Sequence, residues 1–354
     1  MSAQTTDIAI IGGGLAGLAL AHHLHRAGRD FQLFEARPRL GGRIAALEGH
    51  DGAPGAVDLG PSWFWPGQPR MAALTRALGL RVFDQYAQGE ICLEEADGRI
   101  LRGAGCASME GSLRVAGGMV ALVRALAATL PAARLHLSAP VAGITQAGAL
   151  HLATGKTWQV AQIVLALPPR LVAALEITPP LPSAQHAALL AIPTWMAGQA
   201  KFAALYPRPF WRDKGLSGDV MSRLGPLAEI HDASGADGTP AALFGFVGIP
   251  APQRAGRAED LSRLALAQLA RLFGPEALTP LGSALQDWAF LPETATQVDL
   301  IPPPGHPDYG LPRALSDLWE GRLHLAASET APEMGGYLEG ALAAAEQVAR
   351  RLGA

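Results

Sequence analysis

The chain has 354 residues, which is enough for two domains of roughly 150 residues each. Hydrophobic residues make up 49% of it and charged residues only 17%, a balance that excludes an intrinsically disordered protein. The 28 basic and 31 acidic residues leave a net charge of -3, so we expect no nucleic-acid partner. Lysine is rare among the 28 basic residues: three are lysines (Lys156, Lys201 and Lys214) and the others are arginines.

Cys92 and Cys106 are too few for a disulfide framework or a four-thiolate metal site, and no other cluster predicts a metal. Glycines interrupt the apolar segment 8–25 and four prolines interrupt 177–200, so we expect no membrane helix. The polar N-terminal residues lack the cationic start of a secretory signal. We therefore expect a cytoplasmic protein without a membrane partner; its oligomeric state is left open.

The first elements along the chain form a βαβ unit. Residues 7–11 (DIAII) predict a buried strand, residues 15–27 have helical spacing and end at Gly28, and residues 31–35 (FQLFE) predict a second strand. This unit of about 30 residues is typical of a dinucleotide-binding fold.

The turn between the first strand and the helix carries the motif GxGxxG at residues 12–17 (GGGLAG). In such a turn the first glycine makes the tight bend, the second lets the backbone approach a pyrophosphate, and the third lets helix and strand pack closely. A carboxylate at the end of the second strand accepts hydrogen bonds from ribose hydroxyls. We therefore predict that Gly12, Gly14, Ala16, Gly17 and Glu35 bind a dinucleotide.

Residues 35–43 (EARPRLGGR) and 57–62 (VDLGPS) resemble the flavin-containing amine oxidase family, of which monoamine oxidase is the best-known member. The resemblance implies that the dinucleotide is FAD and that Arg43 lies on its pyrophosphate. It also implies further cofactor contacts by Ala36, Arg37, Gly42, Gly60, Pro61 and Ser62. Arg37 and Arg39 can equally be read as solvated surface arginines.

The resemblance continues through 113–144, 163–169 (IVLALPP) and 323–341. It implies that Val141 meets the adenine through its backbone and that Glu329 holds ribityl or pyrophosphate oxygens. The helix that follows Gly335 and Gly336 would direct its positive N-terminal end at the flavin. The remaining implied cofactor residues are Trp288, Gly336, Tyr337 and Leu338; a core tryptophan is an equal reading of Trp288.

The fold class implied is α/β. It combines a Rossmann-like FAD-binding domain of the glutathione-reductase type with a smaller α+β substrate domain that has a mixed sheet. We expect the FAD-binding domain to comprise residues 1–72, 113–190 and 291–354, and the substrate domain 73–112 and 191–290.

Lys201 is the strongest candidate for a catalytic residue. Residues 192–211 (IPTWMAGQAKFAALYPRPFW) resemble the family's strand with its active-site lysine, and strand alternation places Gln199, Lys201 and Ala203 on one face. A cation in such apolar surroundings is costly unless it faces a polar cavity, such as the flavin edge with a bridging water. The retention of a lysine here, in a chain that nearly lacks them, favours an oxidase of amines.

The chain also departs from the family. The family's large helical insert shrinks to residues 71–112, about a hundred residues fewer than in the family, so we expect a small substrate region with a more open or differently covered pocket. Gln297 aligns with the cysteine that carries FAD in monoamine oxidases, which predicts non-covalent FAD. Val298 replaces one of two tyrosines that flank the amine, and Tyr337 is the other, predicted to be catalytic.

Glu229 and His231 share a strand face and could point to the substrate, although a polar strand end is the simpler reading. The predicted function is an FAD-dependent amine oxidase that uses O2 and releases H2O2. Two alternatives stay open. One is a related desaturase or dehydrogenase with another electron acceptor, and the other is a catalytically idle flavin-binding protein.

Overall fold

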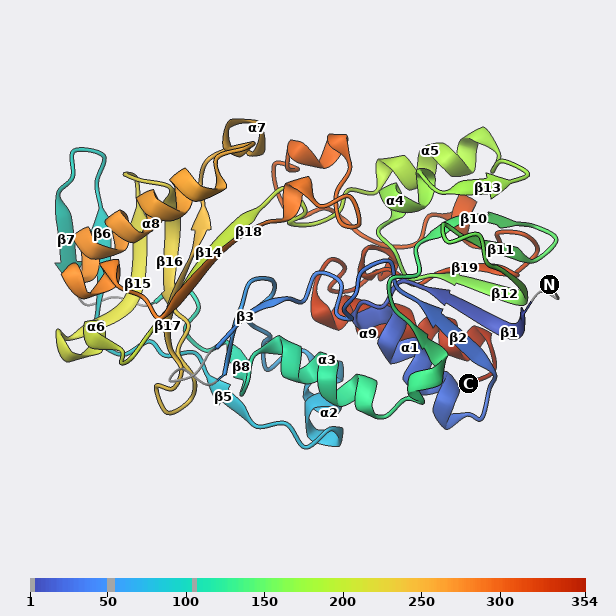
Figure 1. Cartoon of the computed structure of the whole chain (residues 1–354), viewed down its shortest axis with the longest axis horizontal. Helices are drawn as coiled ribbons and strands as arrows, with labels where there is room; N and C mark the ends of the chain where they lie inside the picture. The colour runs from blue at the N-terminus through green and yellow to red at the C-terminus, as the bar shows by residue number, and fades with distance from the viewer. Residues whose placement is uncertain (1–3, 50–54, 104–106) are drawn as a thin grey trace.

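The structure is a computed structural model that describes residues 4–49, 55–103 and 107–354. Its two large sheets lie at opposite ends of an elongated molecule, and the C-terminus lies beside the first sheet (Figure 1). Cys106 falls outside the described residues.

The first sheet confirms the predicted dinucleotide-binding fold. Its strand order is β13 (Glu176–Thr178), β10 (Val141–Thr145), β11 (Ala149–Leu152), β12 (Thr157–Leu165), β1 (Gln4–Ile11), β2 (Phe31–Phe34) and β9 (Leu135–His136), with β19 (Leu323–Leu325) also paired to β12. The strands β9, β2, β1, β12 and β19 run parallel. The carboxyl-terminal parts of β1 and β12 and most of β2 are apolar and buried, as expected when helices or loops cover both faces of a parallel sheet.

Helices cover the first sheet. One face packs against α1 (Leu15–Arg26), α3 (Met119–Ala128) and α9 (Leu338–Arg351) in a single apolar cluster. The shorter helices α4 (Pro169–Ala173) and α5 (Ser183–Ala191) lie near the other face, and α2 (Pro69–Ala77) lies against α9. The last helix of the chain therefore lies beside the first one (Figure 1).

The second sheet is mixed, as expected. Its order is β18 (Gly282–Asp287), β14 (Ala200–Tyr206), β17 (Ala241–Val247), β16 (Leu227–Asp232), β15 (Leu216–Ser222), β6 (Glu90–Glu94) and β7 (Ile100–Gly103). Only the β15–β6 pair is parallel among these described strands. Helix α8 (Ala258–Phe273) packs on one face of this sheet. Helices α6 (Phe210–Asp213) and α7 (Ala251–Arg254) are single turns that follow β14 and β17 in the chain.

Two short antiparallel strand pairs lie apart from the large sheets: β3 (Ala46–Glu48) pairs with β4 (Ala56–Asp58), and β5 (Val82–Asp84) pairs with β8 (Leu113–Val115). Strands β6 and β7 join a sheet otherwise built from residues after 199, so the short segment 73–112 contributes strands rather than a helical insert. The domain boundaries at residues 72, 112, 190 and 290 stay a prediction.

Strand β14 has two distinct faces. Phe202, Ala204 and Tyr206 pack toward α8, whereas Ala203 and Leu205 belong to a cluster with Val57, Leu59 and Trp288. Lys201 lies on this second face, which is the alternation predicted from the sequence. The strand thus directs its lysine away from α8 and toward the cluster that contains Val57, Leu59 and Trp288.

Candidate active site

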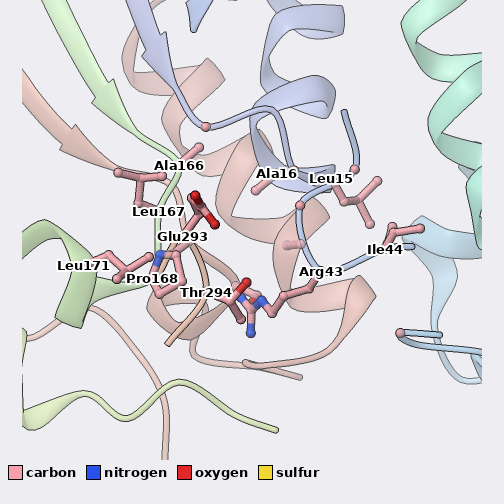
Figure 2. Close-up of a pocket in the computed structure, with 18 of the residues that line it drawn as sticks. Leu15, Ala16, Arg43, Ile44, Ala166, Leu167, Pro168, Leu171, Glu293 and Thr294 are labelled. Atoms are coloured by element: carbon pink, nitrogen blue, oxygen red, sulfur yellow. The ribbon is translucent and has the colours of Figure 1, made fainter. Parts of the chain in front are cut away.

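One large cavity runs from the carboxyl ends of β1 and β2 to the second face of β14. Its volume is about 570 Å³. In an open parallel sheet, ligands bind at this edge. Figure 2 shows Ala16, Arg43, Thr294 and Glu293 around one part of it, contributed by segments far apart in the sequence.

The structure brings most of the predicted residues to this cavity. Its lining includes Gly12, Gly14, Ala16, Glu35, Ala36, Arg37, Gly42, Arg43, Gly60, Pro61, Ser62, Val141, Lys201, Trp288, Gly336, Tyr337 and Leu338. Gly17 and Glu329 lie behind it, and Glu229, His231 and Val298 are not brought to it.

The glycines of the first turn have different reasons to be glycine. Gly12 has φ of +111°, and a Cβ there would lie 2.5 Å from the carbonyl oxygen of Ala166. A Cβ on Gly17 would overlap the Gly12 carbonyl. In contrast, a Cβ on Gly14 would meet only Gly42 Cα at 4.0 Å, and the α1 N-terminus that Gly14 caps has no side-chain cap. Gly14 therefore leaves open space beside free helix N–H groups, which suits a pyrophosphate.

Glu35 is buried directly after β2 and is held by the backbone. Its Oε2 accepts a hydrogen bond from Gly13 N at 2.7 Å, and its Oε1 accepts one from Arg37 N at 2.9 Å. Each carboxylate oxygen can accept a second hydrogen bond, so both remain able to receive ribose hydroxyls.

Arg37 reaches across the cavity rather than into solvent. Its Nη2 donates to Thr294 Oγ1 at 2.7 Å and lies 3.5 Å from Glu293 Oε2. These contacts, which we call the clasp, join the loop after β2 to the segment after the 3₁₀ turn η3 (Trp288–Phe290). Arg39 instead donates to the carbonyls of Leu40, Gly42 and Ile44 and so stabilises its own loop.

Arg43 forms a two-pronged ion pair with a fully buried carboxylate. Nη1 lies 2.6 Å from Glu329 Oε1 and Nη2 lies 3.1 Å from Oε2. Burial alone would lower the pKa of Arg43, but the charge of Glu329 and its hydrogen bond outweigh this and raise it. Glu329 therefore acts on the cavity through Arg43, which it orients and keeps charged.

Lys201 is 2% exposed and lines the cavity. Its Nζ donates to Ser62 Oγ at 2.6 Å and to Gly60 O at 3.1 Å, and it lies 3.6 Å from the centroid of the Phe244 ring. Burial lowers the pKa of Lys201 to about 7, against the opposing charge of Asp58. The amine thus changes its protonation state near neutral pH inside the cavity.

Sequence reasoning missed two buried charges near Lys201. Asp58 ends β4 and accepts a hydrogen bond from Met119 N at 2.7 Å; burial raises its pKa, while the charge of Lys201 opposes this. Arg114 donates to the carbonyls of Ala233 and Ser234, and burial lowers its pKa. Asp58 stands inside the quoted VDLGPS motif, so that motif was the available signal.

Aromatic side chains surround the Lys201 end of the cavity. The lining there includes Trp63, Trp65, Trp195, Phe246 and Tyr337. The sequence reasoning singled out only Tyr337 among these five, because the others come from loops or strand positions without a distinctive spacing.

Tyr337 caps the N-terminus of α9 and is enclosed by other rings. His306 stacks on it with ring centroids 5.0 Å apart, and Trp65 meets it edge-on at 6.3 Å. His306 also contacts Trp195 at 4.8 Å. His306, to which the sequence reasoning gave no role, does not line the cavity, so it supports the Tyr337 ring and does not supply a second wall of the aromatic cage.

The structure does not bring Val298 or Gln297 to the cavity. Both lie on the 3₁₀ turn η4 (Gln297–Leu300), where Val298 is 60% exposed. Neither lines the cavity, whereas Pro292, Glu293 and Thr294 do.

Glu229 and His231 do not contact the cavity either. His231 is fully buried, with Nε2 2.9 Å from Glu229 Oε1 and Nδ1 3.2 Å from Asp219 Oδ2. Burial would lower the pKa of His231, but the two carboxylates outweigh it and raise it. The imidazole packs edge-on against Trp63 at 5.0 Å, so this trio supports the aromatic wall from behind.

Within the described ranges, no helix is long and apolar enough to cross a membrane. The same residues hold no group of three or more His, Cys, Asp or Glu side chains placed to bind a metal ion.

Comparison with known proteins places this cavity in a family. Residues 90–353 match the family described as flavin containing amine oxidoreductase, and residues 10–78 match an NAD(P)-binding Rossmann-like domain. A curated relative is the putative flavin-containing monoamine oxidase AofH of Mycobacterium tuberculosis. It is 28% identical over 469 aligned positions, covering 99% of this chain and 97% of the relative. That alignment is over a hundred positions longer than this chain of 354 residues, so the relative carries segments that are absent here.

Two solved structures share the fold. A putrescine oxidase bound to putrescine matches with a TM-score of 0.80 and 21% identity, covering 99% of both chains. Cyclohexylamine oxidase from Brevibacterium oxydans matches with a TM-score of 0.79 and 20% identity, covering 99% of this chain and 100% of the other. At such low identity these two structures show a shared fold only. The family itself is shown by the family match, which spans most of the sequence. The chain belongs to the flavin-containing amine oxidoreductase family, whose members are oxidoreductases with an FAD cofactor.

Proposed function

We propose that this protein is an amine oxidase that binds FAD non-covalently and passes the electrons to O2. For a primary amine, R–CH2–NH2 and O2 give R–CH=NH and H2O2, and water then converts the imine to R–CHO and NH3. The observation that carries the proposal is the placement of Lys201, a buried lysine that lines the same cavity as the dinucleotide turn.

The residues present fit FAD from the nucleotide end of the cavity to the N-terminus of α9. The open space at Gly14 and the α1 N-terminus suit the pyrophosphate, and Glu35 suits a ribose. Arg43, held by Glu329, supplies the positive charge that an extended pyrophosphate requires. The N-terminus of α9 at Tyr337 offers partial positive charge to the ring system.

A flavin bound by these residues would supply the acceptor for a hydride from the amine's α carbon and the route by which electrons pass to O2. The chain contributes position, desolvation and charge. The rings of Trp63, Trp65, Trp195 and Tyr337 exclude water from the amine and hold its apolar part. The amine must be unprotonated to react, and a cationic Lys201 disfavours a second positive charge beside it.

The cavity lining supports non-covalent attachment. Among the described residues that form it, none is a cysteine or a histidine, the side chains that most readily bond to a flavin. Cys92 is buried in the cluster between the second sheet and α8. Denaturation with acid should therefore release the flavin into the supernatant, and flavin that remains with the pellet would contradict this part of the proposal.

The decisive experiment mixes the purified yellow protein with amines under anaerobic conditions and follows bleaching of the flavin. Admission of air should then restore the oxidised spectrum with one H2O2 per turnover. Bleaching without rapid reoxidation by air would favour the dehydrogenase alternative, and the absence of bleaching by any amine would favour an idle flavoprotein.

We further propose a cytoplasmic location, supported by a sequence with two cysteines and no disulfide framework.

A further inference from the structure

The charged residues of the cavity are divided unevenly between its two ends. Among the described side chains that line it, the charged ones are Glu35, Arg37, Arg43, Lys201 and Glu293. Both carboxylates belong to the nucleotide end, where Glu35 accepts from Gly13 N and Glu293 lies against Arg37. The Lys201 end thus has a lysine and no carboxylate within the described lining.

The surroundings of Lys201 are aromatic instead. Four of the seven tryptophans of the chain, Trp63, Trp65, Trp195 and Trp288, line the cavity. Trp288 Nε1 donates to Leu59 O at 3.0 Å, and Trp63 Nε1 donates to Gln85 Oε1 at 2.8 Å, so these two rings are fixed in place. A rigid wall of this kind buries apolar area without a large entropic cost.

The nearest acidic groups outside the lining are already engaged. Asp58 is buried, accepts a hydrogen bond from Met119 N and interacts with the charge of Lys201. Glu229 and Asp219 both contact His231, which packs against the Trp63 ring. None of these carboxylates lines the cavity. A second ammonium on the substrate would therefore be desolvated without an anionic partner.

We propose that the preferred substrates are monoamines with an apolar body, and that the site discriminates against diamines of the same length. This inference rests on the proposed amine oxidase function and names its substrate class. The physical basis is twofold: a distal ammonium loses its hydration among indole rings, and the cationic form of Lys201 repels it.

The matched test compares n-butylamine with 1,4-diaminobutane, which differ only in the second amine. Anaerobic bleaching of the flavin in the holoenzyme gives the second-order rate constant for each, with benzylamine as an apolar reference. We expect n-butylamine to react at least about tenfold faster than the diamine, and benzylamine faster still. A diamine that reacts as fast as n-butylamine overturns the inference but leaves the amine oxidase proposal intact. If none of the three reduces the flavin, the proposed function fails and this inference falls with it.

A second variant tests the missing carboxylate directly. Gln199 lines the cavity beside Lys201 on the β14 side, and Gln199→Glu adds a negative charge with almost no change in size. We expect the preference for n-butylamine over the diamine to shrink at least about fivefold, with tighter diamine binding seen as a shift of the oxidised flavin spectrum. The control is Gln253→Glu, an exposed position on α7 outside the lining, which should leave the preference unchanged. An unchanged preference in Gln199→Glu would overturn the inference.

Discussion

The two ends of the cavity are built in different ways. At the nucleotide end, short local segments supply backbone geometry: Gly12, Gly14 and Glu35 all follow directly from two neighbouring strands. At the substrate end, side chains from loops and strands far apart in the chain form the walls, among them Trp65, Trp195 and Tyr337. The comparison teaches that a cofactor site can be read from contiguous motifs, while a substrate site depends on how the whole chain folds.

The largest expected effect comes from the nucleotide end. Gly14→Val should abolish flavin binding, lowering affinity at least about a hundredfold, or roughly 2.7 kcal/mol, because the new methyl groups occupy the space for the pyrophosphate. The ratio of flavin to protein absorbance in the purified variant measures this.

The matched control for Gly14→Val is Gly282→Val on the edge strand β18, where an added Cβ meets nothing within 4 Å. That variant should keep its flavin. Full flavin content in Gly14→Val would show that the pyrophosphate does not lie at this turn.

The next effect lies at the substrate end. The pKa of Lys201 is lowered to about 7, so its side chain is an ammonium below that pH and neutral above it. Positive charge favours electron transfer to O2, on which negative charge develops. The rate constant for reoxidation should therefore fall as the pH rises through 7.

The variant Lys201→Met should bind FAD normally, but its reduced flavin should react with O2 roughly ten- to hundredfold more slowly, with no dependence on pH in this range. Stopped-flow mixing of reduced enzyme with O2 decides this, and a variant as fast as the native enzyme removes Lys201 from the oxidative step.

The same lowered pKa has a consequence for folding. The native state binds the Lys201 proton less well than the unfolded chain, whose lysine titrates near 10.5. Burial of the ammonium therefore lowers the free energy of unfolding by its full amount below pH 7, and this loss disappears as the pH rises toward 10.5. Thermal unfolding of the flavin-free proteins should show Lys201→Met to be more stable than the native protein at pH 6, with a smaller advantage at pH 9. An advantage that grows with pH would contradict this sign.

A smaller effect is expected for the clasp. Arg37→Ala removes the contacts to Thr294 and Glu293 across the cavity, each of which is worth about 1 kcal/mol or less. FAD should dissociate roughly three- to tenfold faster, as measured by the recovery of flavin fluorescence on dilution. Arg257→Ala, which removes an exposed ion pair at the start of α8, is the control and should not change this rate. An unchanged rate in Arg37→Ala would show that the clasp does not retain the cofactor.

The smallest effect is expected at residue 298, where the alignment and the structure place the side chain differently. Val298→Tyr restores the tyrosine that a gapless alignment expects beside the amine, but the structure places this side chain 60% exposed and outside the cavity. The rate of flavin reduction by n-butylamine should change less than about twofold. A change well beyond twofold, or altered selectivity among amines, would mean that η4 reaches the substrate after all.

These contrasts explain what could be predicted from sequence. The turn at 12–17, Glu35, Arg43 and Lys201 were found because each stands at a fixed spacing from a strand end or within a strand, and the backbone determines where such residues go. His306, Trp63 and Trp195 were missed because their places depend on tertiary packing between loops. Glu229 and His231 share a strand face, as predicted, but His231 packs against Trp63, whose ring centroid also lies 5.9 Å from Lys201 Nζ.

The ion pair between Arg43 and Glu329 spans 286 residues of sequence. During synthesis on the ribosome, the dinucleotide turn emerges among the first residues, but the partner that orients Arg43 and the helix α9 that packs on α1 emerge among the last. A nascent chain can therefore form its first βαβ unit early without a complete cofactor site. Capture of FAD becomes a late event in the protein's biogenesis, and truncation near the C-terminus would yield a colourless product even though every glycine of the turn is present.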